Sequence, residues 1–151
     1  ALNGALTIGT LDGANVEIKE EVGDDNIFIF GHTAQEVADM KAKDSYRPRE
    51  YYERDERLRR IVDSFVSDRF SVQEPGIFKW LHHTLLESDH YFHLADFDSY
   101  TQTQREAGRV YKDKASWAEK AIINVARVGK FSSDRTIAQY AGEIWDVKPI
   151  K

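Results

Sequence analysis

The first fifteen residues constrain the fold more than any other part of the sequence. They form an apolar stretch of small residues, punctuated by glycine, that runs from Leu2 to Asn15. Such a stretch is typical of the interior of an α/β core, whereas chain ends are more often polar and loosely held. The chain also begins at Ala1 without an initiator methionine, and Met40 is its only methionine. We therefore expect a piece of a larger protein, cut through its core.

Composition predicts a globular chain of about one domain. The chain has 151 residues, of which 41% are hydrophobic and 31% charged, and this is enough apolar material for a folded core. It has no cysteine, so this segment offers no disulfide, thiolate metal ligand or cysteine nucleophile. That composition fits a cytoplasmic protein. No apolar run approaches the roughly 18 residues of a membrane span, so we expect no membrane partner.

Charge argues against a dedicated nucleic-acid partner. The formal net charge is -5, whereas a phosphate backbone attracts basic surfaces. The segment Lys41–Arg60 is rich in arginine, but five acidic residues are interleaved with it: Asp44, Glu50, Glu53, Asp55 and Glu56. We interpret this segment as a solvated helix face with mixed i,i+4 ion pairs.

Two short strands are expected near the start of the chain. Thr7–Asp12 has β-branched residues and ends at an Asp-Gly turn signal. A short helix over Val16–Val22 follows, with Asn15 as its expected N-cap and Gly23 closing it. The unbroken apolar run Ile27–Phe30 suits a parallel strand buried on both faces. Two strands rarely make a stable sheet alone, so we expect them to form the edge of a sheet whose other strands precede Ala1.

The rest of the chain has the 3.6-residue periodicity of helices. Thr33 and Glu36 form an expected capping box, and Pro48 is expected in a first helical turn. Ser116 and Glu119 suggest a second capping box. The region His82–Phe97 has the least regular pattern. Helices are expected over residues 33–43, 48–70, 77–85, 100–111, 116–129 and from Ser132 or Ser133 to about 145.

Histidines are the first candidates for chemistry. His82, His83, His90 and His93 lie within twelve residues, and the spacing of the last two could share a metal on a helix. Without a third ligand in a fixed frame, solvated or hydrogen-bonded histidines are the simpler interpretation.

Glycines and carboxylates give no self-contained active site either. Gly4, Gly9 and Gly13 have the wrong spacing for a dinucleotide fingerprint, and turns and close packing explain them more simply. Asp96 and Asp98 could suggest an acid/base pair, but an N-cap cluster for the helix near Tyr100 is the simpler account. No serine stands in a G-x-S-x-G context.

Segments at both ends of the chain resemble a known family. The run Leu2–Ile18 looks like one typical of glycogen (α-glucan) phosphorylases, and Asn26–Gly31 follows where that family has its next strand. Gly129–Ile137 and the residues of Tyr140–Trp145 resemble the family's C-terminal signature. The resemblance covers essentially the whole chain in the right order. The resemblance is weakest in the middle of the chain, where the tyrosine pair within Glu50–Tyr52 is similar to one found in the family.

The resemblance implies an α/β fold of the GT-B type, in which two Rossmann-like domains flank a cleft. Residues 1–151 would be the distal, C-terminal part of the second domain, with strand, helix and strand over 1–31 and helices over 32–151. The implied reaction is reversible phosphorolysis of α-1,4-glucan ends by inorganic phosphate to glucose 1-phosphate. The implied cofactor is pyridoxal 5′-phosphate (PLP), held as a Schiff base. The protein would contribute positioning and electrostatic stabilisation.

The chain departs from the family in one respect that bears on activity. In the family, the glycine-rich segment that ends in the PLP lysine lies just before the position of Ala1, and no lysine here matches it. We therefore assign no catalytic, cofactor-binding or metal-binding residue to this chain and expect it to be inactive alone. Leu2–Asn15 would pack behind the cofactor segment and fix it against the sheet.

Two other functions stay open from the residues alone. The chain could be a free-standing helical interaction module whose aromatic stripes bind a partner, or part of a nucleotide-sugar glycosyltransferase of the same architecture. Under the phosphorylase hypothesis, its main partner is the N-terminal remainder of the enzyme. The family's dimer contacts lie largely in the first domain, so we expect a homodimeric parent and a monomeric piece.

Overall fold

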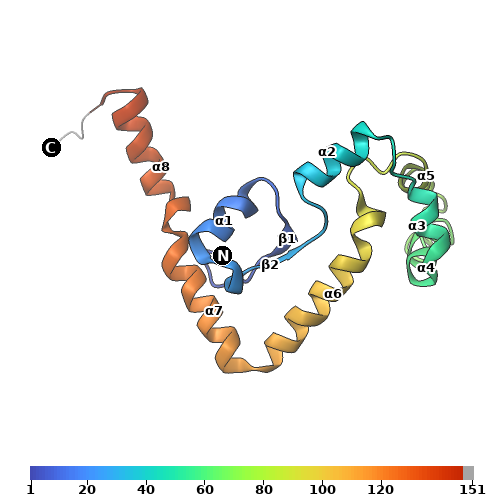
Figure 1. Cartoon of the computed structure of the whole chain (residues 1–151), viewed down its shortest axis with the longest axis horizontal. Helices are drawn as coiled ribbons and strands as arrows, with labels where there is room; N and C mark the ends of the chain where they lie inside the picture. Colours follow the sequence, from blue (N-terminus) through green and yellow to red (C-terminus); the bar gives the residue numbers. More distant parts are fainter. Residues whose placement is uncertain (148–151) are drawn as a thin grey trace. The chain divides into compact units, whose positions relative to one another are not determined.

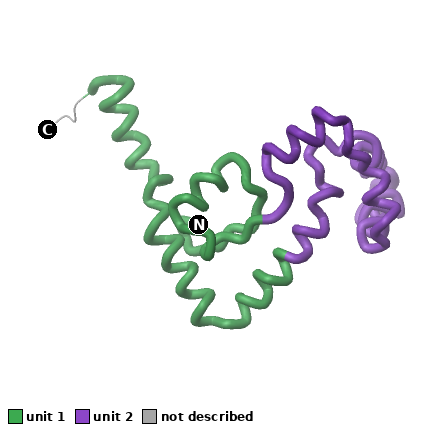
Figure 2. The backbone as a smooth tube through the Cα atoms, in the orientation of Figure 1, with its two compact units in different colours: residues 1–29, 103–151 green, residues 30–102 purple. Residues whose placement is uncertain are grey.

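The structure, a computed structural model, describes residues 1–147 as two compact units (Figure 2). Unit 1 comprises residues 1–29 and the described part of the chain from Thr103 onward, and unit 2 comprises residues 30–102. The chain is mostly helical, and its two short strands, β1 (Ile8–Thr10) and β2 (Phe28–Phe30), pair in parallel. This agrees with the predicted α/β class. Within the described residues, no helix combines the length and the apolar character needed to span a membrane.

Unit 1 packs its first helix against a later one. After β1 its elements are α1 (Ala14–Val22), η1 (Asp24–Asn26), most of β2, the second half of α6 (His93–Lys112), α7 (Lys114–Arg127), η2 (Val128–Phe131), α8 (Ser133–Gln139) and η3 (Tyr140–Ile144) (Figure 1). Its small core consists of Val22, Ile27 and Val128, and α1 contacts both α7 and η2. The apolar side chains of α7 are only partly buried, because Ile122 is 67% exposed and Val125 also faces solvent.

The opening segment follows the predicted order of strand, helix and strand, but Asn15 does not cap α1. The N-cap position is Gly13, which makes no side-chain cap, and Asn15 Nδ2 instead donates to the Thr10 carbonyl at 2.9 Å. A Cβ on Gly9 would lie 2.5 Å from that same Nδ2 atom. A side chain at position 9 would therefore push Asn15 Nδ2 out of this hydrogen bond. The strand β2 is half-buried within these residues rather than buried on both faces.

Unit 2 is helical and has its own core. Its elements after β2 are α2 (Ala34–Ala42), α3 (Pro48–Arg54), α4 (Glu56–Asp63), α5 (Lys79–Glu87) and the first half of α6 (His93–Lys112). The helices α3, α4 and α5 contact one another. The buried residues at the centre are Leu58, Val62, Leu86 and Leu94, with Tyr51, Tyr52, Leu85 and Phe97 packed around them.

The helix signals at Thr33 and Pro48 are confirmed. The Thr33 hydroxyl accepts from the Glu36 backbone N–H at 3.2 Å, and a Glu36 carboxylate oxygen accepts from the Thr33 N–H at 2.7 Å. The hydrogen bonds from Thr33 hold the pKa of Glu36 below its usual value. Pro48 opens α3 at its first position. Both signals depend only on neighbours in sequence, which is why they are readable without tertiary contacts.

The single helix expected over residues 48–70 is wrong, because Asp55 interrupts it. Asp55 has an extended backbone (φ -115°, ψ 111°), and its carboxylate accepts from the N–H groups of Arg57 and Leu58. It therefore ends α3 and caps α4, and the chain turns between them. The second helix ends at Asp63, well before Phe70.

Two further expectations about helix starts are corrected. The region His82–Phe97 is not irregular, since α5 runs to Glu87 and α6 begins at His93. The helix expected from Ser116 begins at Lys114, where Asp113 accepts from the N–H groups of Ala115 and Ser116. In the second case an aspartate just upstream, itself a preferred N-cap residue, caps the helix.

The arginine-rich segment is solvated and ion-paired as predicted, but not through i,i+4 pairs. Arg47 pairs with Asp44 at 3.0 Å. Arg57 reaches Asp55 at 2.5 Å and Asp98 of α6 at 2.6 Å. Because α3 and α4 are separate helices, arginines pair within turns and with other elements instead of along one long helix face.

Replacing Thr33 by alanine should destabilise unit 2. The variant loses the hydroxyl that accepts from the Glu36 N–H, and loss of an N-cap typically costs about 1 kcal/mol. Urea unfolding followed by circular dichroism measures the change. Ser132→Ala is the matched control, because Ser132 occupies the N-cap of α8 without a side-chain cap bond. Equal losses in the two variants would contradict this account of the cap.

Asp55 should make stability depend on pH in the acid range. The hydrogen bond from the Arg57 side chain, with those from the Arg57 and Leu58 N–H groups, lowers the pKa of Asp55 from 3.8 to about 2. A depressed pKa adds stability that is complete above the unfolded-state pKa and is lost as pH falls through the folded-state pKa. We therefore expect Asp55→Asn, which can still cap α4, to lose less stability than the wild type between about pH 4.5 and about pH 2.5.

The measurement is urea unfolding at several pH values in that range. Arg57→Gln removes the main cause of the low pKa and should flatten the pH dependence in the same direction. Parallel pH profiles for Asp55→Asn and the wild type would refute the role of Asp55.

Candidate functional site

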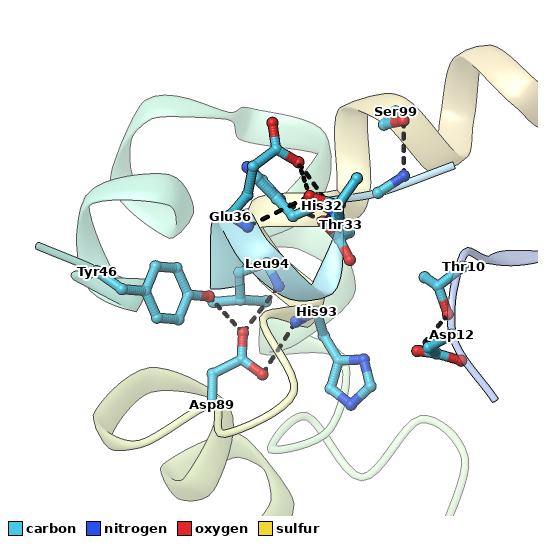
Figure 3. A network of polar contacts seen from close by, with 12 residues as sticks. Thr10, Asp12, His32, Thr33, Glu36, Tyr46, Asp89, His93, Leu94 and Ser99 are labelled. Carbon is cyan, nitrogen blue, oxygen red and sulfur yellow. Dashed lines mark hydrogen bonds and ion pairs between the residues drawn. The ribbon is translucent and has the colours of Figure 1, made fainter. Parts of the chain in front are cut away.

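The most buried carboxylate of unit 2, Asp89, joins three parts of that unit (Figure 3). Its side chain is 2% exposed. It accepts from the Tyr46 hydroxyl at 2.5 Å and from the N–H groups of His93 at 3.1 Å and Leu94 at 2.8 Å. Both N–H groups belong to the first turn of α6, where backbone donors have no partner within the helix and a negative charge is favoured. Asp89 thus caps α6 and fixes the segment between α2 and α3 through Tyr46.

The surroundings of Tyr46 reinforce this junction. The Tyr46 ring stacks on Phe92, with centroids 4.1 Å apart, and contacts the Tyr51 ring. Burial, together with the hydrogen bond to Asp89, raises the pKa of Tyr46 far above its usual value. Tyr46 therefore stays protonated and acts as a hydrogen-bond donor, not as a base. Phe92 has φ 62°, a strained conformation for a bulky residue that persists only where packing enforces it.

A second buried carboxylate, Asp96, holds the chain just after β2. One of its oxygens accepts from the His32 backbone N–H at 2.9 Å and lies 2.6 Å from His32 Nδ1. Nearby, the Gly31 N–H donates to the Ser99 hydroxyl at 3.0 Å. Gly31 has φ 80°, and a Cβ there would lie 2.6 Å from an Asp96 oxygen, so only glycine fits. Asp96 is therefore a tertiary anchor.

The His32–Asp96 contact has the geometry of the orienting half of a catalytic dyad. A carboxylate that accepts from Nδ1 fixes the tautomer and leaves Nε2 as the reactive nitrogen. A dyad also needs a nucleophile beside Nε2, and the side-chain hydrogen bonds described for His32 run to Asp96. The neighbouring hydroxyl, Ser99, is occupied by the Gly31 N–H. The arrangement can position a loop, and we assign no reaction to it.

The four candidate histidines have different surroundings. His82 lies 3.8 Å from Asp63, and His93 contacts the Tyr91 ring. His83 lies on α5, and His90 lies in the connection to α6. Among residues 1–147, no group of three or more histidine, aspartate or glutamate side chains could hold a metal ion.

The predicted carboxylates and glycines have structural roles that differ in part from the expectation. Asp96 and Asp98 do not cap a helix at Tyr100, because α6 already begins at His93. Asp98 instead pairs with Arg57. Gly4 and Gly13 both have positive φ, and a Cβ on Gly4 would touch α7, as the interpretation of turns and close packing predicted.

Sequence reasoning missed Asp89, the residue on which this network depends. The only local signal was a Ser-Asp pair shortly before a possible helix start, and Asp89 lies four residues ahead of His93 rather than at the N-cap position. Its partner Tyr46 is 43 residues away. No periodicity connects residues at that separation.

No lysine among residues 1–147 is buried. A Schiff-base lysine is desolvated so that its amine can be neutral. The buried polar residues of residues 1–147 are Asp89, Asp96 and Asn124, so none of the described lysines meets that condition.

Comparison with known proteins decides the family. The family model for carbohydrate phosphorylases matches residues 1–147. The chain belongs to the carbohydrate phosphorylase family. It is similar to the glycogen phosphorylases of Synechocystis sp. (51% identity over 99% of this chain) and Haemophilus influenzae (48% over 100%). It is also similar to the human muscle form (46% over 98%). The chain spans about 18% of the length of each of these relatives.

Family membership agrees with the resemblance found at the two ends of the sequence. The match extends through the middle of the chain as well, including unit 2 and its two buried carboxylates. This phosphorylase segment therefore includes a helical unit whose polar interior fixes its own loops.

Asp89→Asn should destabilise unit 2 strongly. The amide keeps the size of the side chain but loses the charge that accepts from Tyr46 and the start of α6, and such charge-assisted hydrogen bonds suggest a loss of about 2 kcal/mol. Asp98→Asn is the matched control, because Asp98 is 61% exposed in its side chain and exposed ion pairs contribute little. Urea unfolding compares the two. A loss for Asp89→Asn no larger than the control's would disprove the anchoring role.

Proposed function

We propose that this chain works as one portion of an α-glucan phosphorylase. The parent enzyme would release glucose 1-phosphate from α-1,4-glucan ends with inorganic phosphate, and would therefore be a glycosyltransferase. The observation that supports this most directly is the similarity of 46 to 51% identity to glycogen phosphorylases along nearly the whole chain. The enzyme's activity and substrates are extended to this chain by that similarity.

The parent would have a GT-B architecture with this chain in its second, C-terminal domain. The parallel pair β1–β2 with α1 between its strands is the kind of unit from which Rossmann-like domains are built. Two strands of three residues are marginal as an isolated sheet, which favours their joining strands from the remainder of the enzyme.

The cofactor and partners follow from the same proposal. PLP in the parent would be held by a lysine outside this chain, since the described lysines do not fit that role. The remainder of the phosphorylase, α-1,4-glucan and inorganic phosphate would be its partners, in a homodimeric cytoplasmic enzyme. The isolated chain would be monomeric and inactive, with Leu2–Asn15 bracing the cofactor segment of the parent.

The rival functions receive less support. A free-standing helical interaction module would not be expected to match a phosphorylase family model over residues 1–147. A nucleotide-sugar glycosyltransferase would share the architecture but not these relatives.

A chimera tests the proposal. The matching segment of the Synechocystis glycogen phosphorylase is replaced by this chain, and phosphate-dependent release of glucose 1-phosphate from glycogen is measured. With 51% identity over 150 residues, we expect activity within about tenfold of the unmodified relative, a loss of roughly 1.4 kcal/mol in transition-state stabilisation.

Two controls define what the result means. The relative with the segment deleted should be inactive, and so should the isolated chain supplied with glycogen, phosphate and PLP. Activity of the isolated chain would refute the predicted inactivity. A folded chimera that binds PLP but releases no glucose 1-phosphate would refute the proposed function.

A further inference from the structure

A cavity in unit 2 lies beside the Asp89 junction and is not explained by it. The cavity has a volume of about 500 Å³, within the range of small-molecule sites. One wall comes from the end of α2 and its connection to α3, and the other from the end of α5 and its connection to α6. Every residue that lines it belongs to unit 2, so its shape is set within one compact body.

The base of the cavity is preorganised. Tyr46, Asp89 and Phe92 all line it, and they are locked together by the hydrogen bond and ring stacking described above. Two lining residues, Asp44 and Phe92, have positive φ although neither is glycine. Strained backbone of this kind gathers at ligand sites. The Asp89 carboxylate already accepts three hydrogen bonds, so it offers little to a ligand.

Three cationic side chains line the same cavity: Lys41, Arg47 and Arg49. The Lys41 ammonium lies 5.5 Å from the centroid of the Phe92 ring. Within the described residues it has no ion-pair partner. An ammonium group that contacts an aromatic ring but has no anionic partner can still bind an anion.

The two arginines are paired, but with exposed partners. Arg47 makes a bidentate contact with Asp44, at 3.2 and 3.0 Å, and the Asp44 side chain is 90% exposed. Arg49 pairs with Glu87, which also lines the cavity, and their side chains are 56% and 42% exposed. Exposed pairs of this kind contribute little to stability. A dianion that brings several oxygens to one place can therefore compete for both guanidinium groups.

We propose that this cavity binds a phosphate monoester of a small hydroxylated molecule. The phosphate would contact Lys41, Arg47 and Arg49. The ester group would occupy the rest of the cavity, where Ser88 and His90 supply polar groups. A free phosphate ion would fill only a minor part of the volume, which is why the ester is favoured over the ion. The proposal uses only lining residues and does not depend on the parent enzyme's reaction.

Binding to the full 151-residue chain tests the proposal, with glucose 1-phosphate as the probe. Isothermal titration should show saturable binding that weakens as salt rises. Lys41→Gln should weaken it by about tenfold. Lys43→Gln is the matched control, because Lys43 ends the same helix and does not line the cavity, and it should change affinity by less than about twofold.

Inorganic phosphate and glucose test separately how the phosphate and the sugar of the ligand are recognised. Both should bind more weakly than glucose 1-phosphate. Equal affinity for inorganic phosphate would refute the recognition of the ester group, and equal affinity for glucose would refute the recognition of phosphate. Equal losses in Lys41→Gln and Lys43→Gln, or no binding up to about 10 mM, would overturn the site.

Amide chemical shifts of the wild-type chain give a second readout that needs no variant. Glucose 1-phosphate should shift the amide signals of Tyr46, Ser88 and His90. Shifts confined to other residues would overturn the assignment. These measurements report binding to the isolated chain and not catalysis, so their outcome is independent of the activity of the chimera.

Discussion

The requirement that buried carboxylates be hydrogen-bonded shapes unit 2. A buried charge without partners is expensive, whereas one that accepts several N–H and O–H donors is stable and rigid. Asp89 accepts hydrogen bonds on both oxygens and Asp96 on one, and each has a donor far away in sequence. Each therefore fixes a connection between helices as well as satisfying its own charge.

Asp96 and its neighbours also tie together the two ends of unit 2. His32 and Gly31 at its start bond to Asp96 and Ser99 near its end, and the Phe30 ring contacts the Tyr100 ring at 5.1 Å. A unit whose chain enters and leaves at neighbouring points can hold its own core of Leu58, Val62, Leu86 and Leu94. Such closed ends are typical of segments that fold as local units.

Unit 1 has a small core and exposes several large apolar side chains. Within the described residues, its core cluster has three buried hydrophobic residues. Side chains such as Ile122, Ile137 and Trp145 are more than half exposed within the described chain. Exposed apolar surface of this extent marks contact surfaces, and under the proposed function the remainder of a phosphorylase would cover it. Unit 2 also exposes large apolar side chains, among them Phe70, Val72 and Trp80, so neither unit buries all of its apolar surface within the described chain.

The sequence by itself determined the features that depend on near neighbours. The strand, helix and strand order at the start, the Thr33–Glu36 capping box and the position of Pro48 all follow from residues within one or two turns, where backbone geometry and capping act. The family, too, was recognisable from the two end motifs. Tertiary structure decided where residues distant in sequence meet. The capping of α6 by Asp89 and the anchoring role of Asp96 depend on Tyr46 and His32, because a carboxylate takes the donors that the fold brings to it.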